Sequence, residues 1–178
     1  MMTFTPHSSV LLLVDLQARL MPAIAQHETV VANAVRLARA AKLLGVPVLG
    51  TEQHPDGLGP NVAEIRSLCE ATLAKQYFDA TREQAWPDFL PQGRRDIVVA
   101  GCEAHVCVLQ TVLGLRRLQA PVRLVRDAIG SRDVANRDAA ASRAQAHGAE
   151  LVTTEMVIFE WLETAQNPKF RETLQLVK

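Results

Sequence analysis

The sequence predicts an α/β protein in which helices cover both faces of a parallel β-sheet. Residues 9–16 are almost wholly apolar, and a strand that is apolar on both faces must be covered on both faces, as in parallel sheets. Short apolar runs of this kind alternate with segments of helical spacing, a pattern typical of βαβ units. A length of 178 residues with 48% hydrophobic residues predicts one domain, which we place at residues 1–178.

The first strand, helix and second strand follow one another closely. The apolar run 9–16 reaches an acidic residue, Asp15, near its end. Residues 29–44 carry valine, leucine and alanine at helical spacing, and Gly45 ends this predicted helix. Residues 46–49 then predict a second extended run.

The middle of the chain repeats this cycle after a loop. Residues 51–60 are rich in glycine and proline, which predicts a loop where α/β folds commonly place their sites. Residues 72–74 are a weaker strand candidate that leads to Lys75. Residues 96–101 predict a strongly buried strand, and a helix is predicted from about residue 104 to residue 119.

The last third of the chain predicts two more strands and three helices. Residues 122–125 form a short strand, and an alanine-rich helix is expected at 135–147. A last short strand is predicted at 150–153. The final segments with helical spacing lie at residues 155–162 and 170–177.

Charge and hydropathy exclude several classes of partner. Nineteen basic residues balance nineteen acidic residues, so no net field favours nucleic acid. The apolar runs are far shorter than the roughly 20 residues of a membrane span, and the N-terminus carries no secretory signal. We therefore expect a cytoplasmic protein with no nucleic-acid or membrane partner. Its cysteines are few and odd in number, which predicts reduced thiols at Cys69, Cys102 and Cys107.

Three chemically complementary residues follow predicted strands. Asp15, Lys75 and Cys107 each lie at or just beyond the C-terminal end of a strand, and in a doubly wound sheet these ends converge on one crevice. Taken singly, such residues are usually a turn aspartate, a surface lysine and a small buried hydrophobe. Taken together, they predict a thiol nucleophile with a base and a cation beside it.

The motifs that carry these residues resemble the isochorismatase-like cysteine hydrolases over nearly the whole chain. They read LVDLQ at 13–17, KQYF at 75–78 and VAGCEAHVCV at 99–108. The resemblance implies a three-layer, Rossmann-like α/β/α fold with a six-stranded, mainly parallel sheet and a catalytic triad of Asp15, Lys75 and Cys107. It also implies a cis peptide bond between Cys102 and Glu103, with the N–H groups of Glu103 and Cys107 forming an oxyanion hole.

Within that family the segments TEQHP (51–55) and GLGP (57–60) are most similar to the isochorismatase domain-containing proteins. The related nicotinamidases hold a metal with an Asp-x-His pair and a further histidine after the second strand. This chain has Gln53 and His54 there and no second histidine nearby, so we expect neither a metal nor a cofactor. Enzymes that cleave isochorismate lack the nucleophilic cysteine, so Cys107 favours cleavage of a carbon–nitrogen bond.

The sequence thus predicts a metal-independent cysteine hydrolase of small amide or carbamoyl substrates. Two alternatives stay open: an inactive module that binds a metabolite or a partner protein, and a redox sensor that uses Cys102 and Cys107. A thiol pKa well below about 8.5 would favour the enzyme over the inactive module. Candidates for the substrate pocket are Gln17, His54, Phe78 and Cys102.

The resemblance also implies a homo-oligomer, either a dimer or a tetramer. The C-terminal segment contains an apolar group that could form the contact between subunits or belong to the core. Its members are Val157, Ile158, Trp161 and Leu162.

Overall fold

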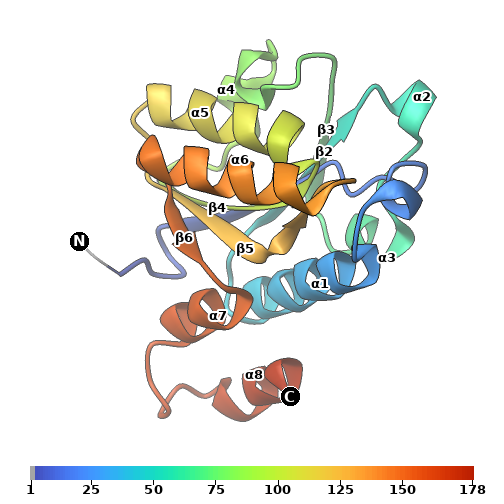
Figure 1. The fold of residues 1–178 in the computed structure, drawn as a ribbon. Helices are drawn as coiled ribbons and strands as arrows, with labels where there is room; N and C mark the ends of the chain where they lie inside the picture. The colour runs from blue at the N-terminus through green and yellow to red at the C-terminus, as the bar shows by residue number, and fades with distance from the viewer. Residues whose placement is uncertain (1–2) are drawn as a thin grey trace.

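The computed structural model describes residues 3–178, whose strands form one parallel sheet. The strand order in the sheet is β3-β2-β1-β4-β5-β6 (Figure 1). Successive strands are added on one side of β1 up to β3 and on its other side from β4 onward, so the switch point lies between β1 and β4. The predicted three-layer α/β/α fold is confirmed, and every strand pair is parallel. The strands are β1 (Ser9–Val14), β2 (Val48–Gln53), β3 (Ala71–Lys75), β4 (Asp96–Cys102), β5 (Val122–Gly130) and β6 (Glu150–Val152).

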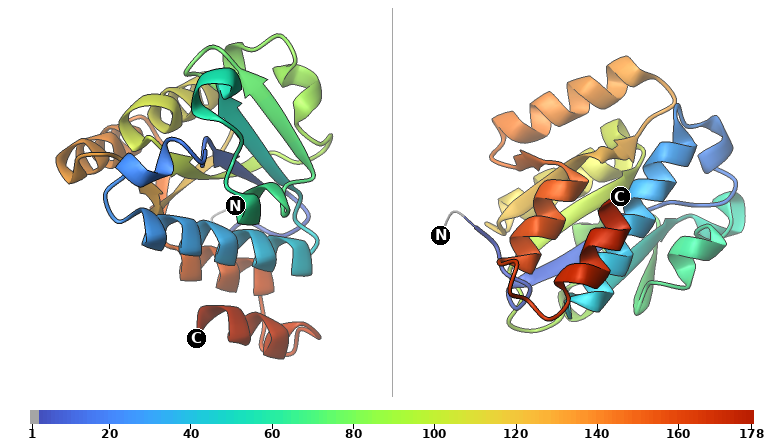
Figure 2. Two further views of the ribbon diagram at one scale, coloured as in Figure 1. Left: turned by 90° about the vertical axis from the view of Figure 1, so that its right-hand side faces the viewer. Right: turned by 90° about the horizontal axis from the view of Figure 1, so that it is seen from below.

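Helices cover both faces of the sheet. In Figures 1 and 2, α1 and α7 pack on one face, α5 and α6 pack on the other, and α8 lies outside α1 and α7. No helix within residues 3–178 is long and apolar enough to cross a membrane. The helices are α1 (His27–Leu43), α2 (Pro55–Leu58), α3 (Ala63–Arg66), α4 (Trp86–Phe89), α5 (Leu109–Arg117), α6 (Val134–Ala146), α7 (Thr154–Leu162) and α8 (Phe170–Val177).

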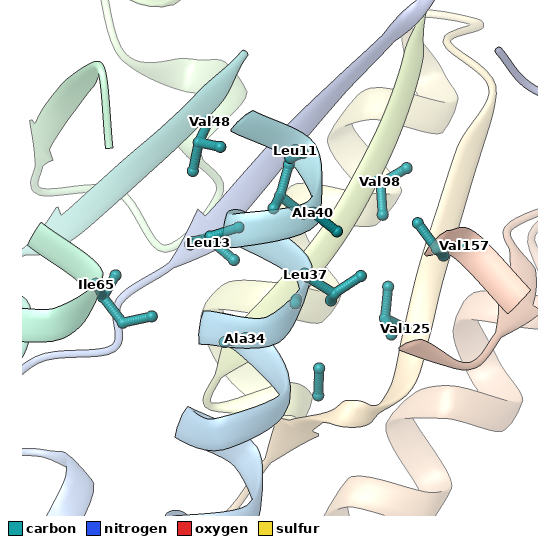
Figure 3. Packing of buried hydrophobic residues seen from close by; sticks show 14 of the residues in the cluster. Leu11, Leu13, Ala34, Leu37, Ala40, Val48, Ile65, Val98, Val125 and Val157 are labelled. Carbon is teal, nitrogen blue, oxygen red and sulfur yellow. The ribbon is translucent and has the colours of Figure 1, made fainter. Parts of the chain in front are cut away.

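The strand β1 divides the core into two clusters. Its residues are all buried, and side chains of successive strand residues point to opposite faces. Leu11 and Leu13 belong to the cluster under α1, where Figure 3 shows them beside Leu37. Val10, Leu12 and Val14 belong to the cluster under α5 and α6. Each fully buried side chain of this size contributes roughly 2 kcal/mol by leaving water, so the continuous apolar run of β1 is explained by burial on both faces.

Strand pairing changes two of the predicted boundaries. The segment predicted as a loop at 51–60 begins as strand, because β2 pairs with β1 as far as Thr51 and with β3 as far as Gln53. The glycine- and proline-rich part forms the short helix α2 instead. β5 runs past residue 125 to Gly130, because a register shift between Val99 and Gly101 lets it pair with the end of β4.

The structure also answers two expectations about helices, one on where a helix begins and ends and one on whether an apolar group is exposed. The predicted helix 104–119 starts as a π-helical turn at Ala104–Val108, and α5 ends at Arg117. The apolar group on α7 is buried in the core of this chain and is therefore not free to contact a second subunit. Its members Val157, Ile158, Trp161 and Leu162 are at most 1% exposed.

The central strands approach each other closely where they end. Gly101 pairs with Val14, and a Cβ atom at Gly101 would overlap the Val14 carbonyl oxygen. Gly101 also has a φ of +125°, which side chains rarely allow. This close pairing leaves the residues after β1 and β4 side by side at the switch point of the sheet, where α/β proteins bind ligands.

Candidate active site

A buried ion pair lies at the carboxyl ends of β1 and β3. The Lys75 Nζ lies 2.8 Å from the Asp15 Oδ2, and both side chains are fully shielded from solvent. The Thr51 hydroxyl donates to the other carboxylate oxygen at 2.6 Å. Asp15 adopts a left-handed backbone with φ +48°, a conformation that aspartate tolerates better than most residues and that ends β1 at this position. The carboxylate is therefore held from two sides.

Gln53, at the end of β2, joins this pair to the thiol. Its side-chain oxygen accepts a hydrogen bond from Lys75 Nζ at 2.6 Å and one from the Cys107 thiol at 3.8 Å. Its amide nitrogen donates to the Gln76 carbonyl at 2.8 Å, which fixes the orientation of the carboxamide. The sequence pattern does not single out Gln53, because it predicts a loop at this position. Its position opposite Lys75 in the β2–β3 register brings it to the site, and the local sequence does not indicate that register.

The Cys107 thiol lies in the π-helical turn just before α5, and it is buried. Burial and the charge and hydrogen bonding of Asp15 raise its pKa to about 12, although Lys75 lowers it. The pKa well below about 8.5 that would favour an enzyme over an inactive binding module is therefore not found for Cys107. Removal of the thiol from water outweighs the neighbouring charge. At neutral pH Cys107 is a thiol beside a carboxylate that can accept its proton.

The turn before Cys107 contains the backbone N–H and carbonyl groups of Glu103, which differ in their hydrogen bonding. The peptide bond between Cys102 and Glu103 is cis. The Glu103 carbonyl accepts hydrogen bonds from the N–H groups of Val106 and Val108. The Glu103 N–H, in contrast, has no hydrogen-bond acceptor among the described residues. It is therefore free to bind an oxygen atom of a ligand.

A small pocket opens onto these groups. It has a volume of about 120 Å³, and Asp15, Gln53 and Cys107 form its polar wall together with Glu103. The Glu103 carboxylate accepts from the Arg132 N–H at 3.0 Å and from the Arg132 Nε at 3.1 Å. The apolar wall consists of Leu20, Leu58, Phe78 and Val106.

Of the residues predicted to line the pocket, Phe78 does so. The other three candidates, Gln17, His54 and Cys102, are not among the residues that line this pocket. The Gln17 amide is buried and is used by the backbone, since it donates to the Gln53 and Gly59 carbonyls and accepts from the Gln53 N–H. His54 is exposed and its ring lies against Gly57. Cys102 is buried in the core cluster under α1, whereas Cys107 belongs to the cluster on the other face.

The described residues contain no group of side chains typical of a metal site. Within residues 3–178, no set of three or more histidine, cysteine, aspartate or glutamate side chains is arranged to hold a metal ion. The site chemistry that the described residues offer is that of a thiol, a carboxylate, an ammonium group and a neutral amide.

Comparison with known sequences identifies the family. The model of the isochorismatase domain matches residues 9–156. Isochorismatase domain-containing protein 2 of Pongo abelii is 39% identical over 176 residues, which cover 97% of this chain and 84% of that protein. The human protein of the same name is 38% identical, with the same coverage of both chains.

Comparison with solved structures gives the same fold. The MAR1 ribonuclease of Caenorhabditis elegans superposes with a TM-score of 0.93 at 31% identity, covering 98% of this chain and 92% of that one. YcaC of Escherichia coli, described as an octameric hydrolase of unknown specificity, gives 0.91 at 24% identity, covering 99% and 89%. YcaC of Pseudomonas aeruginosa, solved with covalent acrylamide, also gives 0.91 at 24% identity, covering 98% and 91%.

Proposed function

Because the chain belongs to the isochorismatase-like hydrolase family, we propose that it hydrolyses a carbon–nitrogen bond of a small amide or carbamoyl compound through a thioester on Cys107. The observation that carries this proposal is the contact of the Cys107 thiol with Gln53 and with the Asp15–Lys75 pair, of which Asp15 lines the same pocket as Gln53 and Cys107. No metal takes part in the proposed reaction.

In the first half of the reaction, Asp15 removes the thiol proton as the sulfur attacks the substrate carbonyl carbon. The thiol has a raised pKa and no resting thiolate, so this proton transfer accompanies the attack. Lys75 orients the carboxylate and stabilises the thiolate as it forms. The free Glu103 N–H, together with the Cys107 N–H, binds the oxyanion of the tetrahedral intermediate. Asp15 then gives its proton to the leaving nitrogen, and ammonia or an amine departs.

In the second half, water hydrolyses the thioester. The Asp15 carboxylate, again ionised, takes a proton from water as the water oxygen attacks the acyl carbon. The carbon–sulfur bond breaks, the carboxylic acid product leaves, and the thiol recovers its proton. The same base thus serves both halves, which fits one carboxylate held in a fixed position by Thr51 and Lys75.

A screen for ammonia release from small amides, ureides and carbamates tests the proposal. With any substrate found, Cys107→Ala should lower kcat/KM by at least about 10³-fold, since loss of a nucleophile removes covalent catalysis. A mass increase equal to the acyl group should appear on Cys107 in acid-quenched wild-type protein. Cys69→Ala removes a half-buried thiol elsewhere and is the matched control. Full turnover by Cys107→Ala would overturn the mechanism.

The alternatives predict other outcomes. An inactive binding module would bind small amides without releasing ammonia or forming an acyl adduct. A redox sensor would form a reversible Cys102–Cys107 disulfide, but in the structure both cysteines are free and they belong to core clusters on opposite faces of the sheet.

Ribonuclease activity, which the name of the C. elegans relative states for that protein, is not favoured by this pocket. The pocket holds about 120 Å³, and among its described lining residues two are carboxylates and none is a lysine or arginine. Binding of RNA requires cations that neutralise phosphates. We expect no cleavage of RNA by the purified protein.

We also propose that residues 1–178 act as a single domain in a cytoplasmic homo-oligomer. The three free thiols agree with a reducing compartment. The Escherichia coli relative is described as an octamer, which supports assembly of this chain into a dimer, a tetramer or a larger ring. Since the apolar group on α7 is buried within the chain, the contact must use another surface.

A further inference from the structure

We infer that the pocket accepts uncharged amides with a short apolar acyl group and rejects compounds that carry a carboxylate near the reacting carbonyl. This inference rests on the proposed function, because it describes the acyl group that Cys107 would receive. It is carried by the volume of the pocket, its apolar wall and the sign of the charges that line it.

Volume and lining limit the acyl group to a small apolar one. A pocket of about 120 Å³ corresponds to the liquid volume of roughly four water molecules. Leu20, Leu58, Phe78 and Val106 supply one wall, and these side chains offer no hydrogen bond to a ligand. A propionyl or isobutyryl group would replace water against this wall and gain by its burial. A polar chain would lose its hydration there without compensation.

The charges on the other wall disfavour an anion. Asp15 and Glu103 are among the residues that line the pocket, and no lysine or arginine is among its described lining residues. The Asp15 side chain is shielded from solvent, whereas the Glu103 side chain is 10% exposed. The two cations nearest to these carboxylates are already engaged. Lys75 Nζ contacts Asp15 and donates to Gln53 and two backbone carbonyls, and Arg132 is bonded to Glu103. A substrate carboxylate would therefore face like charges without gaining a cation of its own.

Another cation near the pocket is Arg19. Its neighbour Leu20 lines the pocket, and the Arg19 N–H pairs with the carbonyl of Leu58. The guanidinium group, however, donates to the carbonyls of Asp56 and Gly57 and does not line the pocket. It therefore stabilises the α2 segment and offers no binding partner to a substrate anion inside the pocket.

Alkylation of Cys107 tests this inference without any knowledge of the substrate. Iodoacetamide and iodoacetate have nearly the same shape and differ in charge. Both react with a thiolate, so the low acidity of Cys107 cancels in the ratio of their rates. The ratio, measured on the Cys107 peptide by mass spectrometry, is divided by the same ratio for the uncharged thiol 2-mercaptoethanol. We expect this normalised preference for iodoacetamide to be about tenfold or more, as for exclusion of a like charge from a partly desolvated site.

Two glutamine variants separate the pocket from the rest of the surface. Glu103→Gln removes the carboxylate at the pocket and should lower the normalised preference several-fold. Glu150→Gln removes another glutamate that is paired with an arginine, at the start of β6 outside the pocket, and should leave the preference unchanged. Thermal unfolding of each variant establishes that it is folded before the rates are compared.

The outcomes distinguish this inference from the proposed function. A normalised preference near one in the wild type would overturn the inference even if amide hydrolysis were demonstrated. Failure of both reagents to label Cys107 after long incubation at pH 10, where a thiol of pKa about 12 is still ionised to roughly 1%, would also overturn it, because the pocket would then admit no small ligand. A strong preference that Glu103→Gln reduces, in a protein that releases no ammonia from any amide, would support the inference about the pocket and overturn the proposed hydrolysis.

Discussion

The two ends of the sheet each hold a cluster of charges, and the clusters differ in burial. At the carboxyl ends of the strands, Asp15 and Lys75 are fully shielded from solvent. At the amino ends, Arg123 bridges Asp96 at 3.1 Å and Glu150 at 3.2 Å, and these two carboxylates are 20% and 55% exposed. The Arg123 guanidinium group also lies 4.0 Å from the centre of the Phe4 ring.

This difference separates a structural cluster from the cluster that we propose to be catalytic. Arg123 packs on an aromatic ring while its carboxylate partners keep part of their hydration, an arrangement that stabilises the fold at little cost. The Asp15–Lys75 pair loses its hydration completely, and a buried ion pair of this kind is often no more stable than an apolar replacement. The contact of Asp15, Lys75 and Gln53 with a thiol gives a chemical reason for keeping the pair buried.

The largest effect that we predict is that of Lys75→Met. This change leaves the Asp15 carboxylate buried without its cation, which should lower the free energy of unfolding by about 3–5 kcal/mol. Hydrolysis should fall below detection, since Asp15 then lacks the cation that orients its carboxylate. Urea denaturation and ammonia release measure the two effects.

The double variant Asp15→Asn with Lys75→Met sharpens this result. Removing both charges should restore most of the lost stability and none of the activity. A double variant that remains as unstable as Lys75→Met would show that the pair stabilises the fold in its own right. The two ends of the sheet would then not differ in the way that we argue.

A smaller effect is predicted for Arg123→Met at the opposite end of the sheet. Asp96 and Glu150 are both partly exposed and can regain water, so the expected cost is about 2 kcal/mol, between the values for surface and buried pairs. The kcat/KM for an amide should stay within about twofold of the wild type, because the site lies at the other end of the strands. Loss of activity in a folded Arg123→Met protein would contradict the separation of the two clusters.

Much of the fold could be predicted from the local sequence pattern, because the two central strands of the sheet are continuous apolar runs. β1 and β4 lie in the middle of the sheet, and the sequence predicts both within two residues of their observed ends. The ends of β2 and β5 escape prediction because partner strands set them. Gln53 is polar and follows a glycine, a threonine and a glutamate, yet it belongs to β2 because it pairs with Lys75 of β3. Nothing in the local sequence announces such a register.

The sequence predicts three residues that the structure brings together, but it does not predict the acidity of the thiol. Asp15, Lys75 and Cys107 could be found because each follows a strand end. The raised pKa of Cys107 could not be found, since it depends on how completely the folded chain excludes water from the sulfur. Gln17 and Gln53 show the same limit. The Gln17 side chain is hydrogen-bonded to backbone groups. The Gln53 side chain is hydrogen-bonded to the Cys107 thiol and the Lys75 ammonium group.

The smallest predicted effect concerns alkaline pH, to which the two ends of the sheet should respond differently. The pKa of Cys107 rises from 9.0 to about 12 on folding. Above pH 9 the thiol of the unfolded chain loses its proton while the folded chain keeps it, so stability falls as pH rises toward 12. This thiol contributes at most about 1.4 kcal/mol of that loss for each pH unit. Cys107→Ala should therefore lose stability less steeply between pH 9 and 10 than the wild type does. Arg123→Met keeps every thiol and should retain the wild-type slope, so an equal slope in all three proteins would mean that folding does not weaken the acidity of Cys107.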